Sequence, residues 1–352
     1  VDFPGPADID WQGDPTGKNL EWPWQLNRFR QLMPLVAGAE NEDSEAGQAL
    51  VDILNSGLEI PVPVDADGGA TRAHRTIDTG IRMARAIPRM LPWLLRNAEN
   101  ELLARLLDNL RRSQKRLHAR HRTGNWLTME MNGLFASTFY LPADPQTDEF
   151  RQYALSTQLT GLDMQLLPDG MQYELSPSYH LVCVSNVMPM VHLGRRAQLE
   201  DPRLDKLEKR AERMVRTLGL LIMSTGLCPA PQDSGPVSLQ RLRGYIPDLQ
   251  PPQKSTELPN AGYTVLRHGN ASVFFDAGRY GVAHQHQDKL NVLWSVDDSM
   301  LLIEHGTQTY ENTVYRRLCL GSGGHNVLLV DGKGQWRTRN DDPDTDKQFD
   351  FA

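Results

Sequence analysis

The spacing of the apolar residues changes near residue 225, and this change limits the folds available to the chain. From Trp22 to about Thr225, apolar residues recur at helical spacing in segments broken by Pro and Gly. Two stripes stand out: Leu102, Leu103, Leu106, Leu107 and Leu110, and then Leu204, Leu207, Ala211, Met214, Leu218 and Leu221. Another helix is predicted from Phe150 to Leu167, where the turn Pro168-Asp169-Gly170 ends it. Many helices without intervening strands predict a helical bundle or toroid.

Beyond a proline-rich segment, the spacing becomes that of β-strands. Residues 227–259 predict a linker, because they contain Pro231, Pro236, Pro247, Pro251, Pro252 and Pro259. Short β-rich runs separated by Gly and Asp turns then predict an antiparallel sheet: Tyr263–Arg267, Ala271–Asp276, Asn291–Val296, Met300–Ile303 and Asn326–Val330.

Three regions follow from this change of pattern. A helical domain spans 1–226, with an extended arm up to about Asn19, and is followed by the linker over 227–259. A β-sheet domain spans 260–352. Because about 90 residues are few for a β-sandwich, we expect this domain to be incomplete at Ala352, soon after the acidic stretch at 341–344.

Composition excludes several classes of protein. The net charge of -7 argues against nucleic acid as a partner, because such proteins usually carry a basic surface. An anionic ligand could bind only where Arg and Lys gather locally against the overall field. No apolar run approaches the roughly 20 residues that span a bilayer. Three cysteines, far apart and odd in number, predict neither a disulfide framework nor a Cys-based metal site.

The densest polar cluster is the run His284-Gln-His286-Gln-Asp288, which lies between two strand-like runs. Residues two apart on an extended backbone point to the same face, so the two imidazoles would lie together. Glu304 and His325 follow further along the chain. Imidazole and carboxylate groups are typical zinc ligands, and three protein ligands are a common zinc arrangement. The spacing alone fits equally well with polar residues that make ordinary hydrogen bonds at strand ends.

A second polar cluster lies in the helical region. Thr123-Gly-Asn125-Trp126 opens a helix that carries Glu130 and Asn132 one or two turns later. Further on, Glu174 precedes Ser176-Pro177 and the pair Tyr179-His180. Taken singly, these residues have simpler interpretations: Asn125 is a common N-cap type, and Tyr179-His180 fits a half-buried helix start.

Taken together and in order, these motifs resemble the heparinase II/III-like polysaccharide lyases over most of the chain. The resemblance implies an incomplete (α/α) toroid packed against an antiparallel β-sandwich, with the sugar bound in the cleft between them. It rests on the number and order of the motifs: Trp22-Pro-Trp-Gln-Leu-Asn27-Arg28, His74-Arg-Thr-Ile-Asp-Thr-Gly-Ile-Arg82, Gly124-Asn125-Trp126, Asp169-Gly170, Glu174, Ser176-Pro177, Tyr179-His180, Phe275-Asp276-Ala-Gly278, His284-Gln-His286-Gln-Asp288, Leu301-Leu-Ile-Glu304-His-Gly306, His325-Asn326, Val330-Asp331-Gly332 and Gln335.

The resemblance also implies catalytic roles for Asn125, Tyr179 and His284. Asn125 matches the residue that contacts the uronate carboxylate, where a neutral donor stabilises the developing enolate. Tyr179 matches the catalytic tyrosine, which we expect to act as acid and, for one epimer, as base. His284 is the alternative base, because an imidazole titrates near working pH.

Further substrate contacts are expected from Asn27, Arg28, Arg82, Trp126, Glu130 and His180. The guanidinium forks of Arg28 and Arg82 suit a carboxylate or a sulfate, although ion pairs within helices would explain them equally well. Trp126 stands where several members of the family carry His, which leaves the epimer preference open.

The resemblance implies that His286, Glu304 and His325 bind zinc with a structural role. Glu304 stands in place of the more usual Asp. Glutamate can bind zinc, but its longer side chain requires a local adjustment of the backbone.

The expected partner is an anionic polysaccharide, either a heparan-type glycosaminoglycan or alginate, and the expected location is periplasmic or secreted. Neither a signal peptide nor an initiator Met is visible, so Val1 reads as a processed or trimmed start. Two other functions stay open. One is a toroid glycoside hydrolase that uses Glu130, Asp169 and Glu174 as its acids. The other is a glycan-binding protein without catalysis, which a bound but uncleaved ligand would reveal.

Overall fold

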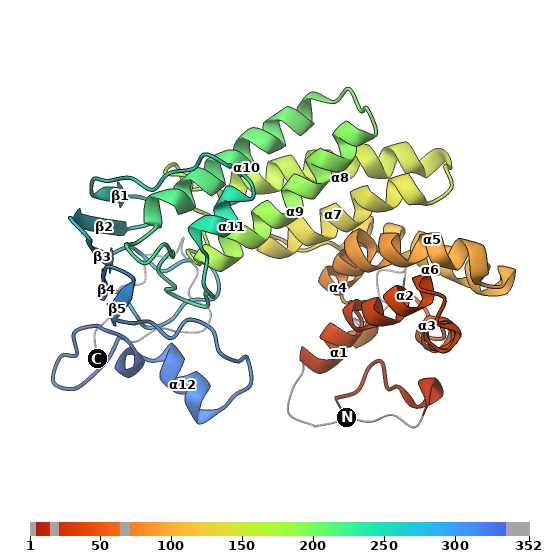
Figure 1. Ribbon diagram of the computed structural model, residues 1–352, viewed down its shortest axis with the longest axis horizontal. Helices are drawn as coiled ribbons and strands as arrows, with labels where there is room; N and C mark the ends of the chain where they lie inside the picture. Colours follow the sequence, from red (N-terminus) through yellow and green to blue (C-terminus); the bar gives the residue numbers. More distant parts are fainter. Residues whose placement is uncertain (1–4, 15–20, 64–70, 336–352) are drawn as a thin grey trace. The chain divides into compact units, whose positions relative to one another are not determined.

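A computed structural model describes residues 5–14, 21–63 and 71–335 (Figure 1). The acidic stretch at 341–344 and part of the predicted N-terminal arm lie outside the described residues. The chain forms two compact units: unit 1 is Val1–Gly161 with Pro189–Leu204, and unit 2 is Leu162–Met188 with Asp205–Ala352. None of the described helices has the length and the apolar character needed to cross a membrane.

Unit 1 is helical. Its elements are η1 (Pro6–Asp8), α1 (Glu21–Leu26), η2 (Arg30–Leu32), α2 (Met33–Glu40), α3 (Ser44–Leu58), η3 (Arg72–His74), α4 (Thr76–Ile81), η4 (Arg82–Ala86), α5 (Ile87–Asn97), α6 (Asn100–Arg120), α7 (Gly124–Tyr140) and most of α8 (Pro145–Gln165). The predicted leucine stripe forms part of α6, where Leu102, Leu106 and Leu110 are buried and Leu107 is on the exposed side. Helical spacing therefore identified three buried positions of this stripe, whereas the inclusion of Leu107 is wrong.

Two glycines allow α4 and α7 to cross in backbone contact. A Cβ atom added to Gly80 would lie 2.6 Å from the carbonyl oxygen of Met129. One added to Gly133 would lie 2.4 Å from the carbonyl oxygen of Gly80. Real Cβ atoms do not approach so closely, so glycine is required at both positions. This crossing brings the start of α4 close to the start of α7, which carries Asn125 and Trp126.

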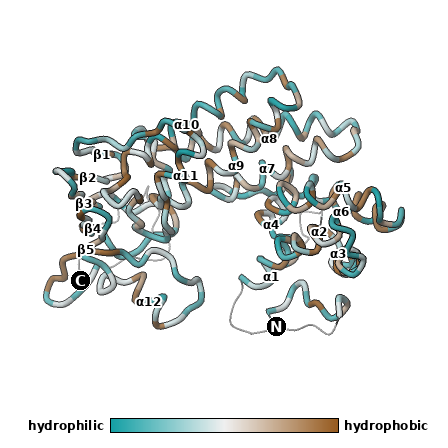
Figure 2. The backbone as a smooth tube through the Cα atoms, viewed as in Figure 1, coloured by the Kyte–Doolittle hydropathy of each residue, from teal (hydrophilic) through white to brown (hydrophobic). Residues whose placement is uncertain are grey.

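Unit 2 combines helices with an antiparallel sheet. α9 (Pro177–Arg196) begins in this unit, and most of α10 (Pro202–Leu221) lies in it. Figure 2 shows teal and brown alternating along α10, as expected of an amphipathic helix. The five-stranded sheet follows chain order: β1 (Thr256–Leu258), β2 (Tyr263–His268), β3 (Ala271–Asp276), β4 (Asn291–Val296) and β5 (Ser299–Leu302).

The sequence predicts most of these elements, with two differences. The strand predicted over Asn326–Val330 is wrong, because the segment makes one isolated bridge, from Val330 to Lys333, and one backbone hydrogen bond, accepted by Asn326 from Val292, but no continuous ladder. Its side chains are largely open to solvent, with Leu328 76% exposed, so β-forming residues here find no strand to pair with in the described chain. The proline-rich segment contains a short helix, α11 (Leu239–Arg243), as well as β1. Beyond the sheet, α12 (Val314–Leu320) and η5 (Ser322–Gly324) complete the unit.

The two faces of the sheet differ in exposure. On one face Val265 pairs with Phe274 and Phe274 pairs with Leu293, and all three side chains are fully buried. On the other face, Trp294 pairs with Leu302, and both are exposed. This face is apolar and open in the described part of the chain, which is typical of one layer of a β-sandwich.

Candidate active site

The rings of Tyr179 and His284 stack in unit 2. Their centroids are 3.7 Å apart and their planes differ by 17°. Tyr179 lies in the first turn of α9, two residues after Pro177, with which the helix begins. The Ser176 hydroxyl donates to the carbonyl oxygen of Asp233 at 2.9 Å, which ties the helix start to the segment beneath the histidine. Two of the three residues that the resemblance implies as catalytic therefore lie in direct contact.

The backbone at His284 is held in an unfavourable conformation. Its φ angle is 61°, in the left-handed region. Such a conformation costs about 1 kcal/mol or more in a residue with a Cβ atom. The backbone N–H of Asp233 donates to the carbonyl oxygen of His284 at 2.9 Å and helps to hold it in place. Strain of this kind often occurs where a side chain must point in one functional direction.

Glu174 orients the imidazole of His284. Its Oε2 atom lies 2.8 Å from Nδ1 of His284, and the carboxylate is buried. The side-chain amide of Gln172 donates to the other carboxylate oxygen at 3.1 Å. Because a carboxylate accepts the proton of Nδ1, Nε2 of His284 is left as the basic nitrogen. The sequence indicated Glu174 only as a family motif residue or as a hydrolase acid.

Tyr310 is a site residue that the sequence analysis missed. Its hydroxyl lies 2.5 Å from the hydroxyl of Tyr179, although 131 positions separate the two residues. Burial and the nearby Asp233 carboxylate raise the pKa of Tyr310, so it stays protonated and can donate to Tyr179. The guanidinium of Arg316 lies 5.1 Å from the centre of the Tyr310 ring. No motif surrounds Tyr310, so only the fold could identify it.

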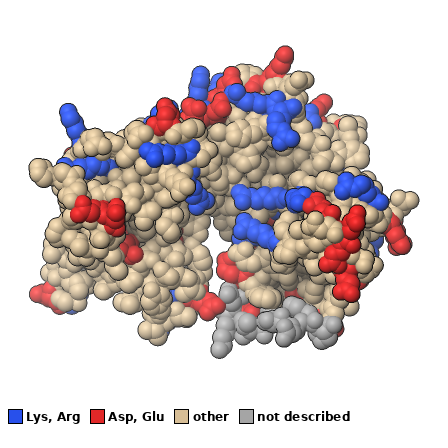
Figure 3. Space-filling view, in the orientation of Figure 1, with Lys and Arg blue, Asp and Glu red and all other residues tan. Residues whose placement is uncertain are grey.

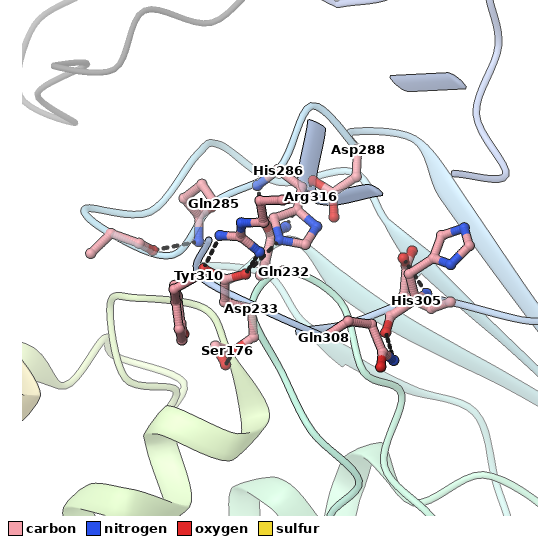
Figure 4. Close-up of polar contacts among 12 residues, drawn as sticks. Ser176, Gln232, Asp233, Gln285, His286, Asp288, His305, Gln308, Tyr310 and Arg316 are labelled. Atoms are coloured by element: carbon pink, nitrogen blue, oxygen red, sulfur yellow. Dashed lines mark hydrogen bonds and ion pairs between the residues drawn. The ribbon is translucent and has the colours of Figure 1, made fainter. Parts of the chain in front are cut away.

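Asp233 lies close to this tyrosine pair and contacts His286 of the predicted zinc site (Figure 4). Its Oδ1 atom lies 2.9 Å from Nε2 of His286, and its Oδ2 atom accepts from Nη2 of Arg316 at 2.8 Å. Burial alone would raise the pKa of Asp233, but His286 and Arg316 outweigh it and lower the pKa to about 2. Asp233 is therefore a carboxylate at neutral pH that fixes the ring of His286.

His286, Glu304 and His325 converge as the resemblance implies, with ligand atoms within 4.8 Å of one another. Nδ1 of His286 and Nε2 of His325 are buried and make no hydrogen bond to the described residues. Nδ1 of His325 lies 2.9 Å from Oε1 of Glu304. Burial opposes charge on both groups, but this contact prevails, so the pKa of His325 is raised and that of Glu304 is lowered. Two available nitrogens beside a carboxylate are a donor set that fits zinc.

A buried polar network supports the loop that carries His284 and His286. The amide of Gln232 donates to Oδ1 of Asp288 at 2.9 Å, and its oxygen accepts from the backbone N–H of His286 at 2.7 Å. Nζ of Lys289 lies 2.9 Å from Oδ2 of Asp276. Burial raises the pKa of Asp276 to about 6, against the opposing effect of Lys289. Second-layer contacts of this kind orient the groups that bind a metal or react.

We name the three histidine–carboxylate pairs the imidazole cluster: His284 with Glu174, His286 with Asp233, and His325 with Glu304. Each ring has one nitrogen bonded to its own carboxylate. The second nitrogen remains for a proton or a metal, and all six residues belong to unit 2.

Asn125 and Trp126 lie in the first turn of α7 in unit 1. Asn125 is buried, and its carbonyl oxygen accepts from the hydroxyl of Thr128 at 2.7 Å. Trp126 is half-buried, and its ring centre is 4.9 Å from the guanidinium of Arg75. The catalytic role predicted for Asn125 and the contact predicted for Trp126 stay predictions, because the two residues belong to a different unit from Tyr179 and His284.

Four of the residues predicted to contact substrate are buried and bond to protein groups: Asn27, Arg82, Glu130 and His180. Asn27 donates to the carbonyl oxygens of Trp11 and Pro23, each at 2.7 Å. Burial lowers the pKa of Arg82 to about 10 and raises that of Glu130. In the described chain these four side chains therefore bond to the protein itself, and their predicted contacts with substrate stay predictions.

Both ring nitrogens of the buried His180 are bonded to backbone groups. Its Nδ1 atom accepts from the backbone N–H of Gln172 at 3.1 Å, and Nε2 donates to the carbonyl oxygen of Met214 at 3.0 Å. Burial lowers its pKa to about 4, so the ring is neutral. Asp169, a candidate hydrolase acid, is likewise engaged, since its Oδ2 atom accepts from the backbone N–H groups of Asn260 and Ala261.

Comparison with known proteins agrees with this architecture. A family model described as heparinase II/III N-terminus matches residues 2–247, and one described as heparinase II/III-like, C-terminal matches residues 250–346. A heparin-sulfate lyase of Pedobacter heparinus is 25% identical over 216 residues, which cover 60% of this chain and 32% of that protein.

Solved structures show the same fold. A crystal structure of heparinase III matches with a TM-score of 0.82 at 16% identity, over 93% of this chain and 57% of that chain. A heparan sulfate lyase from Pedobacter heparinus matches with a TM-score of 0.65 at 19% identity, over 93% and 56%. The chain thus spans about a third of the curated relative (32%) and little more than half of the solved ones (57% and 56%). The predicted fold class, a helical region followed by an antiparallel β-domain, is confirmed.

Proposed function

This chain belongs to the heparinase II/III family, and from that premise we propose that it carries the reaction centre of a polysaccharide lyase. The reaction would be β-elimination on a polysaccharide that contains uronic acid. The observation that carries the proposal is the stacked pair Tyr179 and His284, in which Glu174 fixes the histidine and Tyr310 bonds to the tyrosine. This arrangement supplies an acid and a base side by side.

The reaction requires one proton to leave and one to arrive. A base removes the proton from C5 of the uronate, the electron pair forms the C4–C5 double bond, and the C4–O bond breaks. Nε2 of His284 is basic because Glu174 occupies Nδ1, so it can accept the C5 proton. Tyr179 then gives its hydroxyl proton to the leaving oxygen. For the other epimer Tyr179 would act as base, and a hydrogen bond donated by Tyr310 would stabilise its phenolate.

Asn125 would contribute to the same step by donating to the uronate carboxylate. As electron density moves from C5 onto that carboxylate, a fixed neutral donor stabilises the enolate-like state. The family motif supports this role, and Asn125 is buried at the start of α7.

We further propose that His286, Glu304 and His325 hold zinc in a structural role. Zinc would join three segments far apart in sequence: the loop at 284–288, the end of β5 and the residues after η5. The two buried nitrogens without partners among the described residues support this assignment. The elimination itself uses Tyr179 and His284 and requires no metal-bound water.

The proposed substrate is a heparan sulfate type of glycosaminoglycan. The curated relative is a heparin-sulfate lyase, and one matched structure is a heparan sulfate lyase. Alginate is the second candidate, because it also offers a uronate with a proton at C5 and a leaving oxygen at C4.

The test is absorbance at the unsaturated-uronate band during incubation with heparan sulfate, heparosan and alginate. We expect a rise on one polymer, and Tyr179→Phe should lower its rate by at least about 100-fold, because proton transfer contributes that much or more. Tyr245→Phe is the matched control in unit 2 and should leave the rate unchanged. New reducing ends without the absorbance rise would instead establish hydrolysis, and binding without any cleavage would establish a glycan-binding protein.

A further inference from the structure

A cluster of arginines in unit 1 has no part in the reaction described above. Arg28, Arg30, Arg75, Arg82 and Arg85 belong to α1, η2 and the η3–η4 region or adjoin them. The fully buried carboxylate of Asp78 bonds to two of them, Arg28 and Arg75. Figure 3 shows Lys and Arg side chains gathered over α4. We name these five residues around Asp78 the arginine cluster.

Asp78 fixes two of the guanidinium groups and leaves part of each unbonded. Nε of Arg28 donates to Oδ1 of Asp78 at 2.7 Å, and Nε of Arg75 donates to Oδ2 at 2.7 Å. Arg75 adds a second bond from Nη2 at 3.1 Å. Within the described residues, both Nη atoms of Arg28 and Nη1 of Arg75 make no hydrogen bond, and they are not buried. These nitrogens are donors that remain accessible.

Two tryptophans flank Arg75 and complete the site. The guanidinium carbon lies 3.7 Å from the ring centre of Trp24 and 4.9 Å from that of Trp126. Stacking of this kind holds a guanidinium in one plane. Both indole rings are half-buried, and neither N–H group is buried or bonded among the described residues. The indoles therefore add two more donors beside the two arginines.

The site is recessed and positive. The side chains of Arg28 and Arg75 are only 12% and 16% exposed, yet their free nitrogens reach solvent. Burial and repulsion from Arg28 and Arg85 lower the pKa of Arg30. A chain with a net charge of -7 therefore maintains a local excess of positive charge here. Partial burial strengthens the attraction for an anion relative to an exposed arginine.

We propose that Trp24, Arg28, Arg75 and Trp126 form a subsite for the anionic group of a saccharide, either a sulfate or a carboxylate. The available groups are all donors and two of them are cationic, which favours an oxyanion over a neutral sugar hydroxyl as the main ligand. Planar guanidinium forks suit both anions, and the indole edges offer apolar surface to the pyranose ring. The proposal rests on the lyase function insofar as the ligand is the polysaccharide substrate.

The experiment measures binding separately from cleavage. Isothermal titration calorimetry would use the described chain with Tyr179→Phe, so that the probe stays intact. The probes are a heparan sulfate tetrasaccharide and an unsulfated heparosan tetrasaccharide, which keeps the carboxylates and lacks the sulfates. Arg28→Gln is the main variant, because Asp78 then keeps its two bonds from Arg75.

We expect Arg28→Gln to raise the Kd by about 10-fold or more, since a hydrogen bond between charged groups contributes that much. Trp126→Phe, which keeps a ring beside Arg75 and removes the N–H, should raise it several-fold. Arg112→Gln is the control, because Arg112 is exposed on α6 and pairs with Asp108 away from the cluster. A wild-type thermal midpoint in each variant establishes that the fold is intact.

Weakening confined to the sulfated probe assigns a sulfate to the subsite, and equal weakening on both probes assigns a carboxylate. A Kd within twofold of the parent value for both variants on both probes would overturn the proposal. Failure of the parent to bind either probe would overturn it as well. Cleavage with an unaltered Kd would refute the subsite alone, whereas binding without cleavage in the chain that retains Tyr179 would refute the lyase function alone.

Discussion

The arginine cluster of unit 1 and the imidazole cluster of unit 2 use the same kind of ion pair in different proportions. In unit 1 the single carboxylate of Asp78 bonds to both Arg28 and Arg75, which leaves positive charge and N–H donors in excess. In unit 2 each imidazole has a carboxylate of its own. An excess of fixed cations suits binding of an anion, whereas paired imidazoles with one nitrogen left suit proton transfer and metal binding.

The two clusters also change imidazole acidity in opposite directions. Burial and the charge of Arg82 lower the pKa of His74 to about 3. The carboxylate of Glu304 prevails over burial and raises the pKa of His325. Burial is the largest cause of neutrality in His74 and His180, whereas a carboxylate partner makes the buried His325 ready to accept a proton.

The largest expected effect comes from breaking one of the imidazole pairs. In Glu174→Gln the amide can donate to Nδ1 of His284, which would place the proton on Nε2 and remove the base. We expect kcat to fall by about 1,000-fold with little change in KM, since a wrong tautomer disables such a histidine. Steady-state kinetics with the polymer that the wild-type chain cleaves would measure this. Glu257→Gln, an exposed residue of β1, is the control, and an unaltered kcat in Glu174→Gln would refute the pairing argument.

The next effect is the pH dependence of stability, and it tests the effect of the arginine cluster on His74. The pKa of His74 is about 3 in the folded chain, against an ordinary value of 6.5. Between pH 6.5 and pH 3 the unfolded chain binds a proton at this ring and the folded chain does not. The contribution of His74 to stability is therefore fully present above pH 6.5 and is lost as the pH falls toward 3. The loss is on the order of 4 kcal/mol for a buried group with this shift.

His74→Gln removes the titrating ring and keeps groups that can bond to Ile60 and Arg82. Denaturant unfolding between pH 7 and pH 4 should therefore show a flatter dependence in the variant than in the wild-type chain. Parallel curves for the two proteins would show that His74 is already charged in the native state.

Removal of the metal tests the imidazole cluster as a binding site. If zinc binds only the folded chain, a concentration 100 times its Kd adds about 2.7 kcal/mol of stability. A chelator should then lower the thermal midpoint of the wild-type chain by several degrees and leave that of His325→Ala unchanged. His268→Ala, at the exposed end of β2, should respond as the wild-type chain does. Equal midpoints with and without chelator, together with no zinc by metal analysis, would refute the site.

The smallest effect is expected for the tyrosine that the sequence did not indicate. Tyr310→Phe removes one hydrogen bond to Tyr179 and leaves the stacked ring of His284 in place. We expect kcat to fall about 10-fold with KM unchanged, the loss expected for one hydrogen bond to a charged group. Restoration of the rate at higher pH would support a role in stabilising the phenolate, and a change in KM alone would contradict it.

Motifs in the sequence were informative where chemistry depends on residue type and local spacing. The run from His284 to Asp288 indicated a polar site, and the family resemblance separated His286 from His284. The structure then brings His286, Glu304 and His325 together. The motifs did not predict which of their side chains are buried, because Arg82 and His180 occur in family motifs just as the site residues do. Their contacts are to backbone groups distant in sequence, and no local pattern records such contacts.

The sequence by itself determined the order of elements, because helical and strand periodicities reflect which side chains each segment must bury. It also determined the family and most of the polar residues of unit 2. Only the tertiary structure decided which groups remain available. It joined Tyr310 to Tyr179 across 131 positions, bonded Glu174 to His284, and placed Arg75 between Trp24 and Trp126. The physical reason is that a polar group becomes functional through the partners it lacks as much as through those it has, and long-range packing sets both.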